Sequence, residues 1–129
     1  GVAFDAGRCY ESVRFSFDSA YRGMKRPLAK FPEVTAIFAM SDVMAIGAIR
    51  ALIDMGYKVP EDISVIGFDG TMLAEYSHPR LTTIKQQYKA LATRSIEILF
   101  GQIELNRKPV HELIPFELIQ GESVKAVGE

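Results

Sequence analysis

The sequence predicts an α/β fold built around a parallel sheet. Two apolar, β-rich runs, Val34 to Ala39 and Ile63 to Phe68, flank a helical stretch from about Asp42 to Met55. Strand, helix and strand in this order form a right-handed βαβ unit, whose two strands lie parallel in one sheet. The 129 residues, 48% of them hydrophobic, suffice for one domain with a real core.

The N-terminal part of the chain adds a helix ahead of this unit. Ser16 is a typical N-cap residue, and apolar side chains follow it at helical spacing as far as Leu28. Pro27 has no backbone N–H, so we expect this helix to end or kink near Arg26. The run from Tyr10 to Val13 predicts a short strand before the helix.

Three further elements follow the βαβ unit. A short strand is expected from Leu81 to Lys85. The stretch from about Tyr88 to Leu105 places its apolar residues on one face of a helix, so it is predicted to be amphipathic. A strand from His111 to Ile119 closes the chain. Pro115 restricts that strand to a sheet edge or a bulge, because proline cannot donate to a strand ladder.

The helix from Asp42 to Met55 is apolar almost all round, with only Asp42, Arg50 and Asp54 as polar residues. A helix on one face of a sheet normally keeps a wide polar side. Either this helix is sandwiched within its own chain, or its second apolar face meets a partner. We favour a dimer interface. Gly47 costs about 1 kcal/mol relative to Ala inside a helix, which indicates a close backbone approach on that face.

Charge argues against direct nucleic-acid binding. The 15 Lys and Arg residues against 16 Asp and Glu leave a net charge of −1. A domain that grips nucleic acid through phosphates normally carries a basic face. We interpret the one basic cluster as a solvated helix face; it comprises Arg22, Lys25, Arg26 and Lys30. We therefore expect no DNA contact by this chain.

Cys9 is the only cysteine, so the sequence offers no disulfide and no cysteine pair for a metal. This is typical of a reducing, cytoplasmic compartment. No apolar run approaches the roughly 20 residues that a membrane-spanning helix needs. The first residues lack the features of a signal peptide, and without an initiator Met the chain looks like a piece of a longer protein. We expect no metal, no cofactor and no membrane association.

Polar residues stand where three β-rich runs stop: Ser41, Asp69 and Gln86. The carboxyl ends of parallel strands meet at one edge of a sheet, where such folds bind ligands. The Asp69 carboxylate can accept hydrogen bonds from two vicinal hydroxyls, which suits a sugar. Local alternatives exist: Asp69 with Gly70 as a turn, Ser41 or Asp42 as the N-cap of the next helix, and Gln86 on nearby backbone. The combination favours a ligand site.

An enzymatic function is a competing interpretation. A strand-end Asp can act as a nucleophile or a phosphoryl acceptor, but the residues after Asp69 supply no acidic or cationic partner. His78 and His111 fit no metal-ligand or nucleophile pattern, and the chain has no glycine-rich phosphate loop. We therefore predict that the chain is not an enzyme.

Residues 35–48 read TAIFAMSDVMAIGA, residues 59–69 read VPEDISVIGFD, and residues 79–86 read PRLTTIKQ. These three segments resemble signature motifs of the lactose-repressor and galactose-repressor (LacI/GalR) family of transcriptional regulators. The resemblance extends from about Phe15 to Ser123. It implies a periplasmic-binding-protein-like (type I) fold, a three-layer sandwich around a parallel sheet. Residues 1–129 would be the C-terminal lobe of the effector-binding and dimerisation core, without the DNA-binding headpiece and most of the N-terminal lobe.

The resemblance also implies a function. The parent protein would be a bacterial DNA-binding regulator that responds to a sugar or another small polar effector. The family's effector contacts carry over to Ser41, Asp69 and Gln86. Operator DNA would be bound by the absent headpiece, not by this chain. The protein would be a homodimer, and its interface would comprise Ile46, Ile49, Arg50, Ile53 and Tyr76.

One alternative within the same fold is a periplasmic ribose-type sugar-binding protein of an ABC transporter. Such proteins share the sequence Gly-Phe-Asp-Gly that stands here at residues 67–70. One departure from the LacI/GalR pattern is Gly121, where the family often has Arg. This departure puts in doubt any ligand contact by the C-terminal strand.

Overall fold

The computed structural model describes residues 6–9, 14–105 and 108–126. The predicted strand from Tyr10 to Val13 lies outside these residues. The elements follow in the order η1 (Ala6–Arg8), α1 (Phe17–Gly23), α2 (Lys25–Lys30), β1 (Ala36–Phe38), α3 (Asp42–Asp54), β2 (Ser64–Asp69), α4 (Met72–Tyr76), β3 (Thr82–Gln86), α5 (Tyr88–Leu105) and β4 (Phe116–Ile119).

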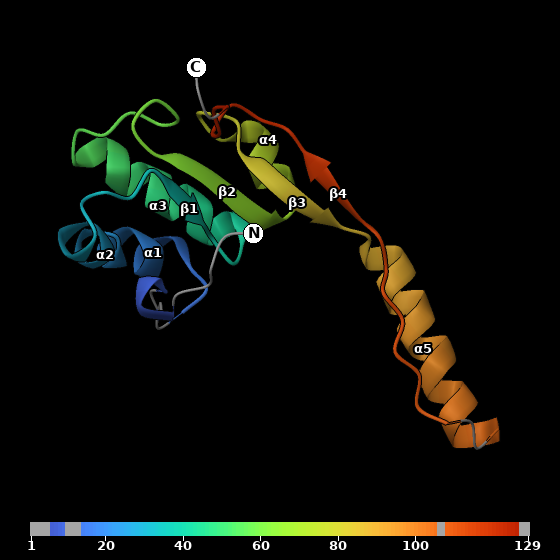
Figure 1. The fold of residues 1–129 in the computed structure, drawn as a ribbon. Coiled ribbons are helices and arrows are strands. Elements are labelled where there is room, and N and C mark those ends of the chain that lie inside the picture. The colour runs from blue at the N-terminus through green and yellow to red at the C-terminus, as the bar shows by residue number, and fades with distance from the viewer. Residues whose placement is uncertain (1–5, 10–13, 106–107, 127–129) are drawn as a thin grey trace.

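The strands of the described residues form one sheet in the order β1-β2-β3-β4 (Figure 1). β1, β2 and β3 are parallel, and β4 runs antiparallel to β3. α3 connects β1 to β2, and α4 connects β2 to β3. Each connection moves one strand along the sheet in the same direction. Because crossovers between parallel strands are right-handed, α3 and α4 lie on the same face of the sheet, where they contact each other. The predicted α/β class is confirmed; the short helix α4 was not predicted.

The N-terminal helix begins as predicted but breaks earlier. The Ser16 hydroxyl caps α1 by accepting a hydrogen bond from the Ser19 N–H at 3.2 Å. α1 ends at Gly23 and α2 begins at Lys25, so the break precedes the predicted position at Arg26. Pro27 lies in the first turn of α2, where its missing N–H would have had no helical partner anyway. The proline is therefore accommodated rather than ending the helix.

α3 lies between the sheet and α1, and this arrangement explains its apolar surface (Figure 1). A Cβ on Gly47 would come within 2.4 Å of the Phe17 carbonyl oxygen, which confirms the predicted close backbone approach. Ala45, Ala48 and Leu52 are buried in the core of the chain itself. The first alternative for this helix, burial within its own chain, thus accounts for most of its apolar side chains.

β1 is shorter and more exposed than the apolar run from Val34 to Ala39 indicates. It spans only Ala36–Phe38, lies at the edge of the sheet, and leaves Phe38 54% exposed. Val65 faces α3 and is fully buried, whereas Phe38 and Phe68 meet edge-to-face at 6.4 Å on the opposite face. Helices of the described residues cover the α3 side of the sheet, so the apolar residues on the other face stay partly open to solvent.

The C-terminal elements extend away from the sheet. α5 has the predicted bounds, and the segment 108–115 returns alongside it (Figure 1). The Arg94 guanidinium joins the two through the Glu112 carboxylate at 2.6 Å. Most apolar side chains of α5 are exposed. β4 is the last strand in the sheet order, which confirms the predicted edge position. The strand begins at Phe116, directly after Pro115, and therefore later than the predicted His111.

Candidate functional site

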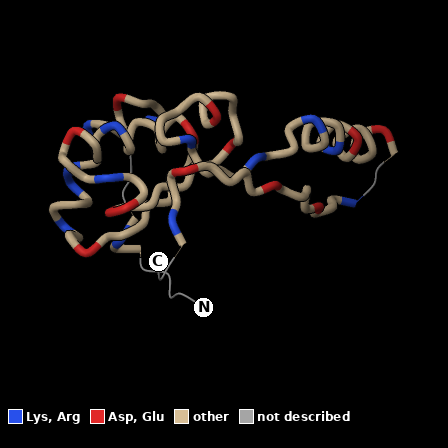
Figure 2. Tube along the Cα trace, turned by 90° about the horizontal axis from the view of Figure 1, so that it is seen from above, with Lys and Arg blue, Asp and Glu red and all other residues tan. Residues whose placement is uncertain are grey.

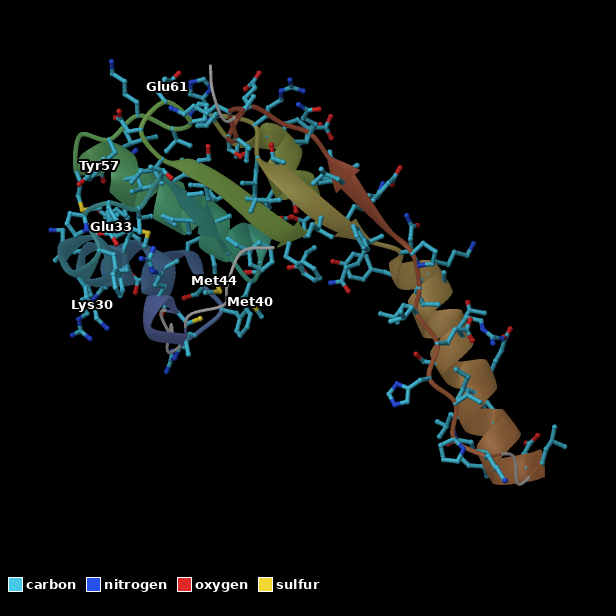
Figure 3. The ribbon with its side chains drawn as sticks, viewed as in Figure 1. Lys30, Glu33, Met40, Met44, Tyr57 and Glu61 are labelled. Atoms are coloured by element: carbon cyan, nitrogen blue, oxygen red, sulfur yellow. The ribbon has the colours of Figure 1, made fainter. Side chains whose placement is uncertain are left out.

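The three predicted ligand residues lie at the carboxyl end of the parallel strands. Ser41 follows β1, Asp69 ends β2 and Gln86 ends β3. Figure 3 shows this end of β1 through Met40 and Met44, which lie at the opposite end of the sheet from Tyr57. The edge therefore carries polar groups from three neighbouring strands, as the sequence predicts.

Asp69 and Gln86 are in direct contact. The Gln86 Nε2 group donates a hydrogen bond to Asp69 Oδ1 at 3.0 Å, and both side chains are half-buried. Asp69 has a φ of 115°, a left-handed conformation that is uncommon for a residue with a side chain. The Gln86 amide binds one oxygen of the Asp69 carboxylate, and the second oxygen can accept a hydrogen bond from a ligand hydroxyl.

Ser41 is occupied locally. Its hydroxyl oxygen accepts a hydrogen bond from the Met44 N–H at 3.2 Å and caps α3, and the residue is buried. The alternative that Ser41 is the N-cap of the next helix is therefore correct for its hydroxyl oxygen. The hydroxyl hydrogen is still available as a donor. Its neighbour Asp42 bonds to Thr71 and Thr83, in the segments that carry Asp69 and Gln86.

Asp42 is a residue that the sequence reasoning treated only as a helix cap. It is fully buried, and its carboxylate accepts hydrogen bonds from the turn after β2 and from β3. Oδ2 accepts hydrogen bonds from the Thr71 N–H at 2.6 Å and from the Thr71 hydroxyl at 2.9 Å. Oδ1 accepts one from the Thr83 hydroxyl at 2.5 Å. We call these three residues the Asp42 bridge. In the sequence, the signal that could have indicated this role was an acidic residue at the start of a nearly all-apolar helix.

Tyr88 is a second residue that the sequence reasoning missed. Its hydroxyl donates to the Asp69 carbonyl oxygen at 2.8 Å, from the first turn of α5. Partial burial of the hydroxyl, and then the nearby Asp69 carboxylate, raise the pKa of Tyr88 above its usual value. An aromatic residue just after Gln86 was the only signal in the sequence.

The residues predicted for a dimer interface have different surroundings. Ile53 is 45% exposed and Tyr76 is 77% exposed, so both present apolar surface. Ile46 is half-buried, and Arg50 is exposed with an ion pair to Asp54 at 3.0 Å. Ile49 is only 3% exposed and packs in the core of its own chain. It therefore has almost no surface to offer a partner.

Charges of both signs alternate along the described trace without a large region of one sign (Figure 2). The described residues contain no group of three or more His, Cys, Asp or Glu side chains that could hold a metal ion. His78 and His111 are both exposed. No helix among the described ranges is long and apolar enough to cross a membrane.

Comparisons with known proteins identify the fold family. Residues 5–124 match the family of periplasmic binding protein-like domains. The HTH-type transcriptional regulator MalR of Clostridium butyricum is 42% identical over 112 residues, which cover 87% of this chain and 33% of MalR. A solved complex of the transcriptional regulator CelR with cellobiose superposes with a TM-score of 0.77 at 33% identity, over 84% of this chain and 34% of CelR.

A second solved structure is the lac repressor dimer bound to operator and the anti-inducer ONPF. It has a TM-score of 0.76 at 31% identity, over 86% of this chain and 39% of that chain. The chain thus spans about a third of the length of MalR and CelR. These relatives are named as regulators, which agrees with the prediction that the chain is not an enzyme. The chain belongs to the family of periplasmic binding protein-like domains, in the form that LacI-type transcriptional regulators carry.

Proposed function

We propose that this chain is the C-terminal lobe of the effector-binding core of a LacI/GalR-type regulator, and that its effector is a sugar or a similar polyhydroxylated molecule. The observation that carries the proposal is the Asp69–Gln86 contact at the carboxyl end of the sheet. A carboxylate with one oxygen fixed by an amide and the other available suits hydroxyl donors. CelR, a relative of this chain, was solved with cellobiose.

Each site residue has a distinct role in this proposal. Asp69 accepts hydrogen bonds from effector hydroxyls. Gln86 orients the Asp69 carboxylate through its amide, and its own carbonyl oxygen can accept from the effector. Ser41 donates its hydroxyl hydrogen while its oxygen caps α3. The other half of the cleft is contributed by a lobe outside residues 1–129.

The mechanism requires the effector to prefer one arrangement of the two lobes over the other, because a ligand shifts an equilibrium only by its differential affinity. In this proposal the protein is a cytoplasmic homodimer. The lobe arrangement sets whether the paired DNA-binding headpieces, which lie outside this chain, bind the operator. Ile53 and Tyr76 supply exposed apolar surface for the dimer interface.

A periplasmic sugar-binding protein of a transporter is the second candidate. The Gly-Phe-Asp-Gly sequence at residues 67–70 favours it as well, because both kinds of protein use this turn. The names of the relatives favour the regulator. Sequencing the gene upstream of this segment separates the two. A helix-turn-helix in the first part of the full protein supports the regulator, and a cleaved signal peptide supports the transporter.

Replacing the Asp69 carboxylate by an amide tests the effector proposal. The full-length protein is titrated calorimetrically with a panel of mono- and disaccharides that includes cellobiose. Asp69→Asn should weaken binding of the saccharide that binds best by roughly 10- to 100-fold, because charged hydrogen bonds contribute about 1.5–3 kcal/mol each. Asp18→Asn is the control, since Asp18 is exposed on α1 and pairs with Arg22. Equal affinity of Asp69→Asn and the unmodified protein would overturn the proposal.

A further inference from the structure

We propose that Asp42 is a positioning residue for the effector site: through the Asp42 bridge it holds the turn after β2 and the end of β3 so that Asp69 and Gln86 meet. The inference rests on the proposed function for its binding consequence. Its structural part, the hold on the turn, stands on the contacts of the Asp42 bridge alone.

The bridge connects the three segments that carry the candidate ligand residues. Asp42 is the neighbour of Ser41, Thr71 is close to Asp69 in the turn after β2, and Thr83 is in β3, which ends at Gln86. The hydrogen bonds of the Asp42 carboxylate go to these two threonines. An acidic residue in the first turn of a helix is often explained by the helix dipole. That explanation does not account for a side chain that bonds outside its own helix.

The sequence also leaves room for this carboxylate. A Cβ on Gly67 would come within 2.6 Å of Asp42 Oδ1 and within 2.7 Å of Leu81 Cδ2. Gly67 lies in β2 beneath the N-terminus of α3, where a larger residue would push the carboxylate out of reach of Thr83. Gly67, the first residue of the Gly-Phe-Asp-Gly sequence, thus leaves the space that the Asp42 carboxylate occupies. Asp42 and this turn are parts of one arrangement.

The turn has a conformation that needs external support. Asp69 has a φ of 115° and Gly70 a φ of 71°, and a Cβ on Gly70 would come within 2.6 Å of the Lys85 Cα. A non-glycine residue in such a conformation persists where its surroundings hold it. The Thr71 N–H and hydroxyl, both bound by Asp42, lie directly after these two residues. The Asp42 carboxylate is therefore placed to supply that support.

A purely structural role is the alternative, because a buried and fully bonded carboxylate also contributes to stability. The two roles differ in what a conservative change does. If Asp42 only stabilises the domain, its replacement lowers the unfolding temperature and leaves the folded site intact. If it positions the turn, the turn loosens in the folded protein, and effector affinity falls with it.

The experiment compares the full-length protein with Asp42→Asn, Thr83→Val and Asp62→Asn. Asp42→Asn keeps the size of the side chain but replaces one accepting oxygen with an NH2 group. Thr83→Val removes a single donor to Asp42 while keeping the shape. Asp62→Asn is the matched control, because Asp62 also accepts a hydrogen bond from a backbone N–H, that of Lys58 at 2.7 Å, outside the Asp42 bridge. Hydrogen exchange of peptides covering residues 66–74 and titration with cellobiose and the saccharide panel are measured for each.

We expect Asp42→Asn to accelerate exchange at residues 69–73 at least tenfold, with α3 and the rest of β2 unchanged, and to weaken saccharide binding at least tenfold. Thr83→Val should produce a smaller change of the same kind, and Asp62→Asn none at the site. Unchanged exchange at residues 69–73, or faster exchange spread evenly over the chain with unchanged affinity, overturns the positioning role. If the unmodified protein binds no saccharide, the sugar proposal fails, and hydrogen exchange alone decides the role of Asp42.

Discussion

At the scale of single residues, Ser41 and Gln86 each make a hydrogen bond within the fold and also have a polar group that can bind a ligand. Ser41 caps α3 with its oxygen, and Gln86 holds the Asp69 carboxylate while lying at the same edge of the sheet. The local and the ligand-binding interpretations of these residues are therefore compatible. A hydroxyl or an amide has several hydrogen-bonding positions, so one can serve the fold while another serves a ligand.

Tyr88→Phe tests the support that α5 gives to Asp69. The change removes the donor to the Asp69 carbonyl. Because this hydrogen bond is exposed, we expect a loss of effector affinity of only about twofold, or about 0.5 kcal/mol. Tyr57→Phe, which removes a hydroxyl outside the site, should change nothing. Calorimetric titration of both variants at neutral pH measures the difference, and equal affinities would argue against a supporting role.

The raised pKa of Tyr88 also predicts a pH dependence. A group whose pKa is higher in the folded protein stabilises it fully below the unfolded pKa, which is about 10 for tyrosine. That stabilisation is lost as the pH rises through the higher folded value. The unfolding temperature should therefore fall more steeply above about pH 10 for the unmodified protein than for Tyr88→Phe, and the two proteins should not differ in slope below that pH.

At the scale of elements, the position of α3 decides both the core and the site. α1 packs on one side of it, the sheet on the other, and its first residues cap the helix and form the Asp42 bridge. Its apolar surface is used mainly inside the chain. Of the residues proposed for the dimer interface, Ile53 of α3 and Tyr76 of α4 present the most apolar surface, and Ile49 presents almost none.

Gly47→Ala tests the close packing of α1 on α3. Alanine normally stabilises a helix by about 1 kcal/mol relative to glycine. Here the new Cβ would lie 2.4 Å from the Phe17 carbonyl oxygen, a backbone atom that cannot move freely. Overpacking of this kind costs about 1–3 kcal/mol, so we expect a net lower unfolding temperature. Ala92→Gly, at an exposed position of α5, is the control that measures the difference in helix propensity between alanine and glycine without a packing contribution. A higher unfolding temperature of Gly47→Ala would contradict the close approach of α1 to α3 at Gly47.

At the scale of the whole molecule, the described residues leave two more apolar surfaces open besides that of Ile53 and Tyr76. One is the face of the sheet that carries Phe38, and the other is the stripe along α5 that includes Ile96 and Ile103. The chain spans about a third of its relatives MalR and CelR. Both surfaces are consistent with a segment that packs against further parts of a larger protein.

The proposed dimer is tested on the full-length protein by placing a charge on its exposed apolar residues. Ile53→Asp and Tyr76→Asp should shift the protein from dimer towards monomer in sedimentation velocity, because an unpaired charge is costly to bury at an interface. Leu113→Asp serves as the control, since Leu113 is 96% exposed in the segment that runs beside α5, away from α3 and α4 (Figure 1). Dimers of unchanged stability in both test variants would refute the interface.

Apart from the short helix α4, the sequence alone was sufficient for the order of the main helices and strands, and for the position of Asp69 and Gln86. Apolar runs and helical spacing are local patterns, and parallel strands necessarily end at one edge. It also located Gly47 as a point of close approach, because glycine is disfavoured inside a helix without a packing reason. The family followed from three motifs in order, and the comparisons confirm it.

Tertiary structure decided what no local pattern encodes. The exposure of Phe38 depends on what covers the far face of the sheet, and the burial of α3 depends on where α1 packs. The bonds from Asp42 to Thr71 and Thr83 join residues distant in the chain, so no window of sequence contains them. Local chemistry determined which residues stand at the binding edge, and long-range packing decided how they are held there.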